Sequence, residues 1–330
     1  MEFSPDYSAE QDGEAAWRHL SSLRHIVGVG MEKCGSSTLH DLLAQVAQIA
    51  TPVEKETYFF NQHLLKGPGW YHGLYRFTGA EKAFLDFTPL YFRELRALEA
   101  IREFPTEKRI LLMIRNPVKR AFSFYQHDIR LHLCEGEAVH RRKKTWRLFD
   151  EPELDFSFEN MWRLQPPYYF HLLAARLQTI FQLYGRESVM VVPLEEFHAA
   201  TGPWLDRLEG FLDLDLSAIK DIPLPHSNKG SLPVFEKRKS GLLGRGRTLF
   251  LTLDGQERRI DAPNERAMDA VLRLQAGWTA SLDPQLADEI YQRHYREDVA
   301  RVEDLSGLDL SRWERDLRRA KEQPVAALRP

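Results

Sequence analysis

One segment of the chain, Gly30–Thr38, lies between two patterns that predict different secondary structures. The residues before it, His25–Val29, form a short apolar run, which predicts a buried strand. After it, Ser36 or Ser37 suits the N-cap of a helix. That helix is predicted from apolar residues at helical spacing: Leu39, Leu42, Leu43, Val46, Ala47 and Ala50. A strand, a turn rich in small residues and a helix in this order begin a parallel α/β unit.

The segment Gly30–Thr38 has the composition of an anion-binding loop. Small residues let backbone N–H groups approach an anion, and the N-terminus of the next helix adds partial positive charge. Lys33 brings a full charge, and the hydroxyls of residues 36–38 can donate to phosphate oxygens. The loop is not a Walker A motif, because Gly35 is followed by serine and the lysine lies two positions before it. This arrangement suits a shorter 5′ group than a triphosphate. The alternative is a turn that only caps the helix.

Further strands and helices are predicted downstream. Asn116–Pro117 predicts the start of a helix that continues to about residue 131, and Pro284–Val302 again has helical spacing. Three more strands are predicted at Ala83–Phe87, Arg109–Ile114 and Ser188–Val192. Strands that alternate with helices predict an α/β, P-loop-like fold of three layers, with a central parallel sheet flanked by helices.

The predicted organisation is a single domain over 21–320, between a flexible N-terminus at 1–20 and a tail at 321–330. The polar stretch 135–160 is interpreted as a surface insertion, and the basic run Arg141–Lys144 within it as a solvated loop or a contact for an anionic acceptor. Residues 223–247 are rich in Gly, Pro, Lys and Arg, which predicts a second loop.

Composition excludes some classes of function and location. The net charge is −3, so the overall balance does not indicate a nucleic-acid partner. The 2 cysteines, Cys34 and Cys134, allow at most one disulfide. Residues 1–13 lack the apolar stretch of a secretory signal, and the longest apolar run, Ile110–Ile114, is far too short to span a membrane. We therefore expect a cytoplasmic protein with no membrane span.

Several short motifs occur along the chain in a fixed order. They are Lys33-Cys34-Gly35-Ser36-Ser37, Glu56-Thr57-Tyr58-Phe59-Phe60, Trp70-Tyr71, Thr88-Pro89-Leu90-Tyr91-Phe92 and the run from Ile114-Arg115-Asn116-Pro117 to Tyr125-Gln126-His127. In these motifs the chain resembles the sulfotransferases that use 3′-phosphoadenosine 5′-phosphosulfate (PAPS), of the heparan sulfate and glycan type. The Tyr-Gln-His ending and Phe59-Phe60-Asn61 resemble the N-sulfotransferase branch, and the lack of cysteines in the late loop fits a bacterial-type cytoplasmic member.

The resemblance implies a cofactor site. The first loop would hold the 5′-phosphosulfate through Lys33, Cys34, Gly35, Ser36, Ser37 and Thr38. Arg115 and Ser123 would hold the 3′-phosphate, the first as a planar fork and the second as a hydroxyl donor. The late loop would close over PAPS, or over its product 3′,5′-ADP, with Asn228, Lys229, Gly230, Arg245, Gly246 and Arg247.

Sulfuryl transfer is an in-line displacement on sulfur, in which the acceptor loses a proton as it attacks. The resemblance puts the general base on Glu56, and Lys33 would stabilise charge on the departing oxygen. His127 is a second candidate, for proton handling or for positioning the sulfuryl group, although a lone histidine is often structural. No metal is required, because Lys33, Arg115 and backbone amides can cover the charge.

The acceptor is expected to be a saccharide or another small molecule with a hydroxyl group, or an amine. The candidate acceptor-binding residues are Phe60, His63, Trp70 and Asp86. Core packing is the alternative for the aromatic residues, and Tyr71 shares that ambiguity. Many relatives have a lysine next to the turn after this strand, but this chain has Asp86-Phe87. Asp86 could bond an acceptor hydroxyl or cap the turn.

Two other functions remain open from the sequence. The first is a P-loop small-molecule kinase or NTPase that uses ATP and Mg²⁺, in which Phe84-Leu85-Asp86 would act as a Walker B strand. The second is a binding module that kept the fold and lost catalysis, although the presence of Lys33 and Glu56 argues against it.

Overall fold

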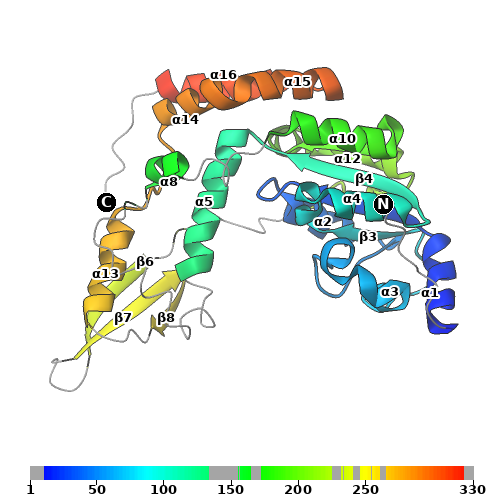
Figure 1. Ribbon diagram of the computed structural model, residues 1–330, viewed down its shortest axis with the longest axis horizontal. Helices are drawn as coiled ribbons and strands as arrows, with labels where there is room; N and C mark the ends of the chain where they lie inside the picture. The colour runs from blue at the N-terminus through cyan, green and yellow to red at the C-terminus, as the bar shows by residue number, and fades with distance from the viewer. Residues whose placement is uncertain are drawn as a thin grey trace. The chain divides into compact units, whose positions relative to one another are not determined.

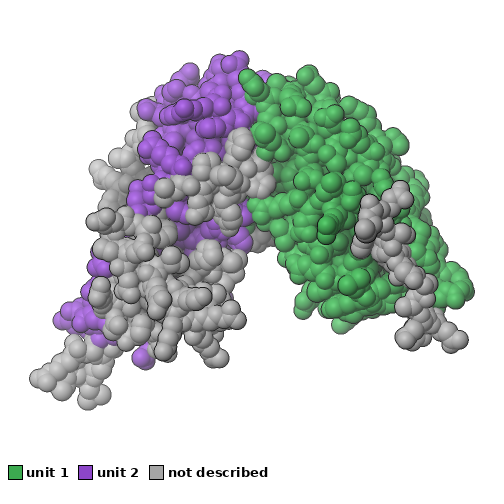
Figure 2. All heavy atoms as spheres, in the orientation of Figure 1, with its two compact units in different colours: residues 1–116, 172–227, 297–309 green, residues 117–171, 228–296, 310–330 purple. Residues whose placement is uncertain are grey.

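The computed structural model describes residues 11–133, 155, 157–164, 172–224, 232, 234–240, 246–253, 255–260 and 265–322. Contacts divide the chain into two compact units, drawn in different colours in Figure 2. The first comprises 1–116, 172–227 and 297–309, and the second 117–171, 228–296 and 310–330. The domain limits expected from the sequence stay a prediction.

The first unit contains a five-stranded parallel sheet flanked by helices, which confirms the α/β prediction (Figure 1). Its strands are β1 (Arg24–Gly30), β2 (Ile49–Ala50), β3 (Ala83–Phe87), β4 (Glu107–Ile114) and β5 (Val189–Pro193), in the spatial order β2-β3-β1-β4-β5. Every residue of β3 and the last five of β4 are buried. Central parallel strands are covered on both faces, so they need continuous apolar runs of this kind.

The remaining elements of the first unit connect and cover these strands. The α-helices are α1 (Gln11–Ser21), α2 (Ser36–Leu43), α3 (Gly67–His72), α4 (Leu95–Glu103), α10 (Ala174–Tyr184), α11 (Leu194–Ala199), α12 (Thr201–Leu212) and most of α15 (Arg296–Ser306). Short π- and 3₁₀-helical segments are η1 (Phe59–His63), η2 (Leu64–Lys66), η3 (Pro89–Arg93), η4 (Arg186–Ser188) and η5 (Ser217–Ile219).

Strand order determines where this unit can bind a ligand. The chain runs from β1 to β2 and β3 on one side of β1, and then crosses to β4 on its other side. The connections after β1 and β4 therefore diverge, and open α/β sheets bind ligands at the carboxyl edge beside such a divergence. The loop after β1 is the predicted anion loop, and Arg115 follows β4 directly.

The second unit combines helices with a three-stranded antiparallel sheet in the order β6-β7-β8. These strands are β6 (Val234–Ser240), β7 (Gly246–Leu253) and β8 (Gln256–Ile260). The helices are α5 (Pro117–Leu133), α8 (Phe158–Leu164), α13 (Glu265–Ala276), α14 (Pro284–Ile290), the π-helical η6 (Tyr291–Tyr295) and α16 (Ser311–Glu322). Helix α13 packs on β6, where Lys237 pairs with Glu265 and Asp269 at 3.0 and 2.7 Å.

Three expectations about secondary structure are wrong. The helix predicted to continue to Ala50 ends at Leu43. The apolar pair Ile49–Ala50 is instead a short strand that pairs with β3 and extends the sheet. Gly35, not Ser36 or Ser37, is the N-cap, and no side chain caps that helix. Part of the predicted loop 223–247 forms β6, in which buried Phe235 and half-buried Lys237 alternate with exposed residues at 234, 236 and 238, as in an antiparallel strand with one solvated face.

Candidate active site

The loop after β1 has a constrained backbone. Lys33 and Gly35 both have positive φ, 63° and 86°, and α2 begins at the next residue, Ser36. The loop is attached to the neighbouring strand, because the N–H of Met31 donates to the carbonyl oxygen of Met113 at 2.7 Å. A side chain in the left-handed region costs about 1–2 kcal/mol, so this shape requires support from its surroundings.

Two further residues with positive φ flank Thr57, namely Glu56 at 66° and Tyr58 at 52°. Three of the four non-glycine residues with positive φ in the described chain therefore belong to the two segments that the sequence assigned to catalysis. Strained backbone of this kind concentrates at functional sites, where the surrounding structure holds it. The conformation is consistent with a site in which Lys33 and Glu56 have fixed positions.

Lys55 connects these two segments. Its Nζ donates to Oγ of Ser37 at 2.9 Å and to Oγ of Ser36 at 3.4 Å. The same Nζ lies 3.6 Å from Oε1 of Glu56. Sequence reasoning missed Lys55, although its position directly before the candidate base was a visible signal. The contacts bring Ser36, Ser37 and Glu56 together at the start of α2.

Glu56 is held on its other side by Tyr58. The Tyr58 hydroxyl donates to Oε2 of Glu56 at 2.5 Å, and the Glu56 side chain keeps 30% of its surface exposed. Burial, together with the adjacent carboxylate, raises the pKa of Tyr58, so this hydroxyl stays protonated and acts as a donor. A carboxylate that is oriented and still accessible is suited to accept a proton from an incoming acceptor.

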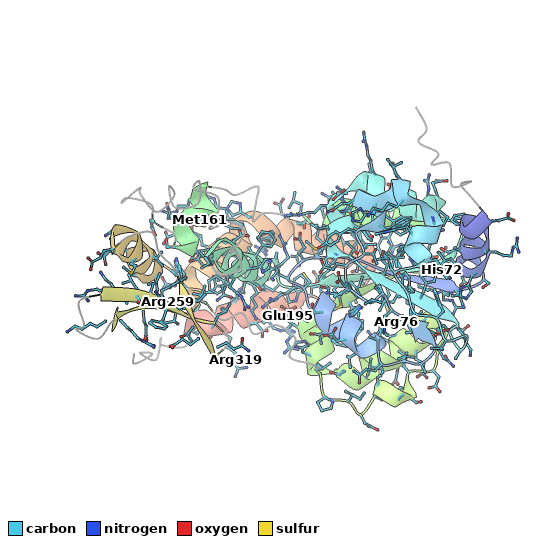
Figure 3. All side chains as sticks on the ribbon, turned by 90° about the horizontal axis from the view of Figure 1, so that it is seen from below. His72, Arg76, Met161, Glu195, Arg259 and Arg319 are labelled. Carbon is cyan, nitrogen blue, oxygen red and sulfur yellow. The ribbon has the colours of Figure 1, made fainter. Side chains whose placement is uncertain are left out.

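Arg115 also reaches the anion loop. Its Nη1 donates to the backbone carbonyl of Lys33 at 3.2 Å, so the residue after β4 contacts the loop after β1. The next residue, Asn116, donates its N–H to Oε1 of Glu195 at 3.1 Å (Glu195 is labelled in Figure 3). The structure thus brings the predicted 3′-phosphate ligand Arg115 to the predicted 5′-phosphosulfate loop.

Asp86 is buried and surrounded by hydroxyl groups, whereas an acceptor-binding residue is expected to be accessible. It is 0% exposed, and its carboxylate accepts four hydrogen bonds. Thr57, Tyr91 and Tyr71 donate to Oδ2 at 2.7, 2.9 and 3.0 Å, and Thr88 donates to Oδ1 at 2.8 Å. Burial raises its pKa, and these hydroxyls act against the shift. The carboxylate has no exposed surface and is fully engaged by these hydroxyls, and acceptor contact by Asp86 stays a prediction.

The aromatic candidates for acceptor binding differ in exposure. Phe60 and Tyr71 are 3% and 0% exposed, and their rings pack together with a centroid distance of 5.6 Å. Both rings therefore pack in the core of this unit, and acceptor contact by Phe60 stays a prediction. Trp70 and His63 are half-buried, with ring centroids 4.9 Å apart, and Lys66 Nζ lies 4.2 Å from the Trp70 ring centroid. Their role with an acceptor stays a prediction.

Ser123 and His127 lie on α5, in the second unit. They are four residues apart, so they occupy one face of the helix, and both are half-buried. The His127 ring lies beside that of Phe124, with centroids 6.5 Å apart. Their roles stay predictions.

The late cofactor residues are only partly described. Asn228, Lys229, Gly230 and Arg245 lie outside the described residues, as does the basic run 141–144. Gly246 begins β7, and Arg247 Nε lies 3.4 Å from Oε1 of Glu265. Within the described ranges, no group of three or more His, Cys, Asp or Glu side chains is arranged to hold a metal, and no helix is long and apolar enough to span a membrane.

Comparisons with known proteins show similarity to sulfotransferases. The chain is 24% identical over 205 residues to heparan sulfate glucosamine 3-O-sulfotransferase 5 of Mus musculus, covering 59% of this chain and 55% of that protein. It is 29% identical over 147 residues to the membrane-associated sulfotransferase kil1 of Dictyostelium discoideum, covering 43% and 28%. The chain thus spans about half, or less, of the length of these relatives.

A solved structure, the sulfotransferase from Alicyclobacillus acidocaldarius, superposes with a TM-score of 0.53 and 22% identity. The match covers 87% of this chain and 97% of that one, which supports a shared fold. The family described as sulfotransferase domain matches residues 23–229, which include β1 to β5, the anion loop, Glu56 and Arg115. This chain belongs to the sulfotransferase domain family.

Proposed function

We propose that this protein transfers a sulfuryl group from PAPS to a hydroxyl or amine of a saccharide. One observation carries the proposal: the Ser37–Lys55–Glu56 contacts, at 2.9 and 3.6 Å, connect the anion loop to the candidate base. Sulfuryl transfer needs one group that binds the leaving phosphate and another, a few ångströms away, that accepts the proton of the acceptor. The anion loop and Glu56 lie at that separation. Membership of the sulfotransferase domain family does not favour the kinase alternative.

The proposed reaction is a single displacement. The acceptor oxygen or nitrogen attacks the sulfur of PAPS, and its proton passes to the Glu56 carboxylate. The bond between sulfur and the 5′-phosphate oxygen breaks, and 3′,5′-ADP leaves with the negative charge. Lys33 and the N-terminus of α2 would stabilise that charge, and Arg115 would hold the 3′-phosphate. No step uses a metal ion.

The acceptor class rests on the relatives. The mouse relative is a heparan sulfate glucosamine 3-O-sulfotransferase, which supports a saccharide as the acceptor of this protein. The experiment below distinguishes a hydroxyl from an amine as the group that receives the sulfuryl. Half-buried Trp70 offers a ring that a sugar face could contact. Cytoplasmic location stays a prediction from the sequence.

Radiolabelled PAPS tests this function. The protein would be incubated in EDTA with heparan sulfate, N-desulfated heparan sulfate or a simple alkyl alcohol. Label in a polysaccharide is expected, and greater labelling of the N-desulfated form would indicate an amine. Label in the alcohol alone would contradict the proposal that the acceptor is a saccharide. Loss of all transfer in EDTA, with activity restored by Mg²⁺, would contradict the metal-free mechanism.

A further inference from the structure

Lys55 is a half-buried cation that neither the sequence motifs nor the proposed mechanism uses. Its side chain is 20% exposed and lies on the segment between β2 and η1. The ammonium contacts Ser36 and Ser37 on one side and Glu56 on another. It also lies 5.8 Å from the ring centroid of Phe87, which has no exposed surface.

The position of Lys55 follows the geometry that an in-line displacement requires. The 5′-phosphate would rest on the residues that begin α2, among them Ser36 and Ser37. The acceptor would lie at Glu56, which takes its proton. The sulfuryl group must lie between these two places, because attacking atom, sulfur and leaving oxygen are aligned. Lys55 Nζ occupies that interval, at 2.9 Å from Ser37 and 3.6 Å from Glu56.

We propose that Lys55 is a further catalytic residue, whose ammonium contacts the sulfuryl end of PAPS and stabilises the charge that develops during transfer. This inference rests on the proposed function. Before the donor binds, the ammonium rests on the serine hydroxyls. When PAPS binds, the sulfuryl oxygens and the bridging oxygen replace those neutral acceptors with charged ones, which form stronger hydrogen bonds.

The surroundings of Lys55 favour this role over that of a surface ion pair. Burial lowers the pKa of Lys55, and the carboxylates of Glu56 and Asp41 oppose that shift. The Lys55 side chain is only 20% exposed and has the apolar ring of Phe87 on one side, so a charge placed there acts more strongly than in bulk water. Lys33 is itself part of the anion loop and would act on the 5′-phosphate.

A lysine that only braces the loop would have a different effect from one that contacts the sulfuryl group. PAPS and 3′,5′-ADP share the adenosine and both phosphates, and only PAPS has the sulfuryl group. Loss of a brace would weaken both nucleotides alike. Loss of a sulfuryl contact would weaken PAPS selectively and slow its conversion to 3′,5′-ADP.

The experiment uses Lys55→Met, Lys55→Arg and the exposed control Lys82→Met. Calorimetry would measure the Kd of PAPS and of 3′,5′-ADP, and product release would be followed with N-desulfated heparan sulfate as the acceptor. For Lys55→Met we expect unchanged 3′,5′-ADP binding, PAPS binding weaker by about tenfold and a rate lower by about 100-fold. Lys55→Arg should recover part of both losses because it keeps the charge, and Lys82→Met should match the wild type.

Equal weakening of both nucleotides in Lys55→Met, or no change in either, would overturn the inference and leave the proposed function in place. If Lys55→Met does not fold, Lys55→Arg still tests the inference. Arginine places its charge at a different distance, so the affinity for PAPS should change relative to the affinity for 3′,5′-ADP. Wild-type protein that binds neither nucleotide would overturn the proposed function, and the inference with it.

Discussion

The hydroxyl of Tyr58 donates to Oε2 of Glu56 at 2.5 Å, while Lys55 Nζ lies 3.6 Å from the other carboxylate oxygen. The candidate base is therefore held from two sides by residues next to it in sequence. Both Glu56 and Tyr58 have positive φ, and this backbone turns the two side chains toward each other across Thr57. Tyr58 thus becomes a positioning residue for the proposed base.

Replacing Tyr58 with Phe should slow sulfuryl transfer by about tenfold, because the Glu56 carboxylate loses the bond that orients it. Binding of 3′,5′-ADP should not change, because Tyr58 does not contact the anion loop through this bond. Rates and calorimetric Kd values would be compared with those of Tyr184→Phe, which removes a hydroxyl bonded to the Leu98 carbonyl on another part of the unit. Wild-type rates in Tyr58→Phe would contradict the positioning role.

Gly35→Ala should disrupt the anion loop. The residue has φ of 86°, and an added Cβ would lie 2.4 Å from Cδ1 of Leu194. Left-handed strain of about 1–2 kcal/mol adds to this clash, so the loop should shift and 3′,5′-ADP binding should weaken strongly. Gly210→Ala is the matched control, because α12 has open space there and alanine favours a helix. Equal nucleotide affinity in the two variants would contradict a site at this loop.

Asp86→Asn should destabilise the first unit. An amide has one acceptor oxygen, whereas the buried carboxylate receives three hydroxyl donors at Oδ2 and one at Oδ1. We expect a loss of about 3 kcal/mol in the free energy of unfolding, measured in urea. Asp304→Asn, on the exposed side of α15, should change it by less than about 0.5 kcal/mol. Equal stability of the two variants would contradict a structural role for the cluster.

Glu81→Gln should remove a source of stability that depends on pH. Burial acts to raise the pKa of Glu81, but hydrogen bonds from Thr78 and Gly79 outweigh it and lower that pKa to about 2, from 4.5. The folded pKa lies below the unfolded one, so the contribution is complete above pH 4.5 and disappears as the pH falls toward 2. Urea unfolding of both proteins should therefore differ at pH 6 and converge near pH 2. A constant difference would contradict this account.

The sequence predicted the part of the fold in which local pattern and burial agree. Ala83–Phe87 is a strand with the predicted limits, and β1, β4 and β5 differ from prediction by one or two residues, because buried parallel strands have unbroken apolar runs. The strand β6 was missed because Lys237 and Lys239 make it look like a polar loop. Their charge is accommodated by the solvated face and by carboxylates on α13, which only the tertiary structure brings near.

The motifs predicted the residues of the candidate site, but they could not predict how deeply each residue is buried. The sequence cannot distinguish an aspartate that meets an acceptor from one enclosed by Thr57, Tyr71, Thr88 and Tyr91, since those partners are up to 29 residues away. Lys55 was missed for a related reason. Its partners on α2 lie 18 and 19 residues earlier in the chain, and a lysine beside a glutamate is an ordinary surface pair until the fold is known.

The most direct test of the central claim is the rate of sulfuryl transfer by Glu56→Gln, measured in parallel with its affinity for 3′,5′-ADP. If Glu56 takes the proton of the acceptor, this variant should bind 3′,5′-ADP as tightly as the wild type and lose at least about 100-fold in rate. Lys33→Ala, measured alongside, should lose both. Wild-type rates in Glu56→Gln would contradict the account and move the base to another residue, with His127 the next to examine.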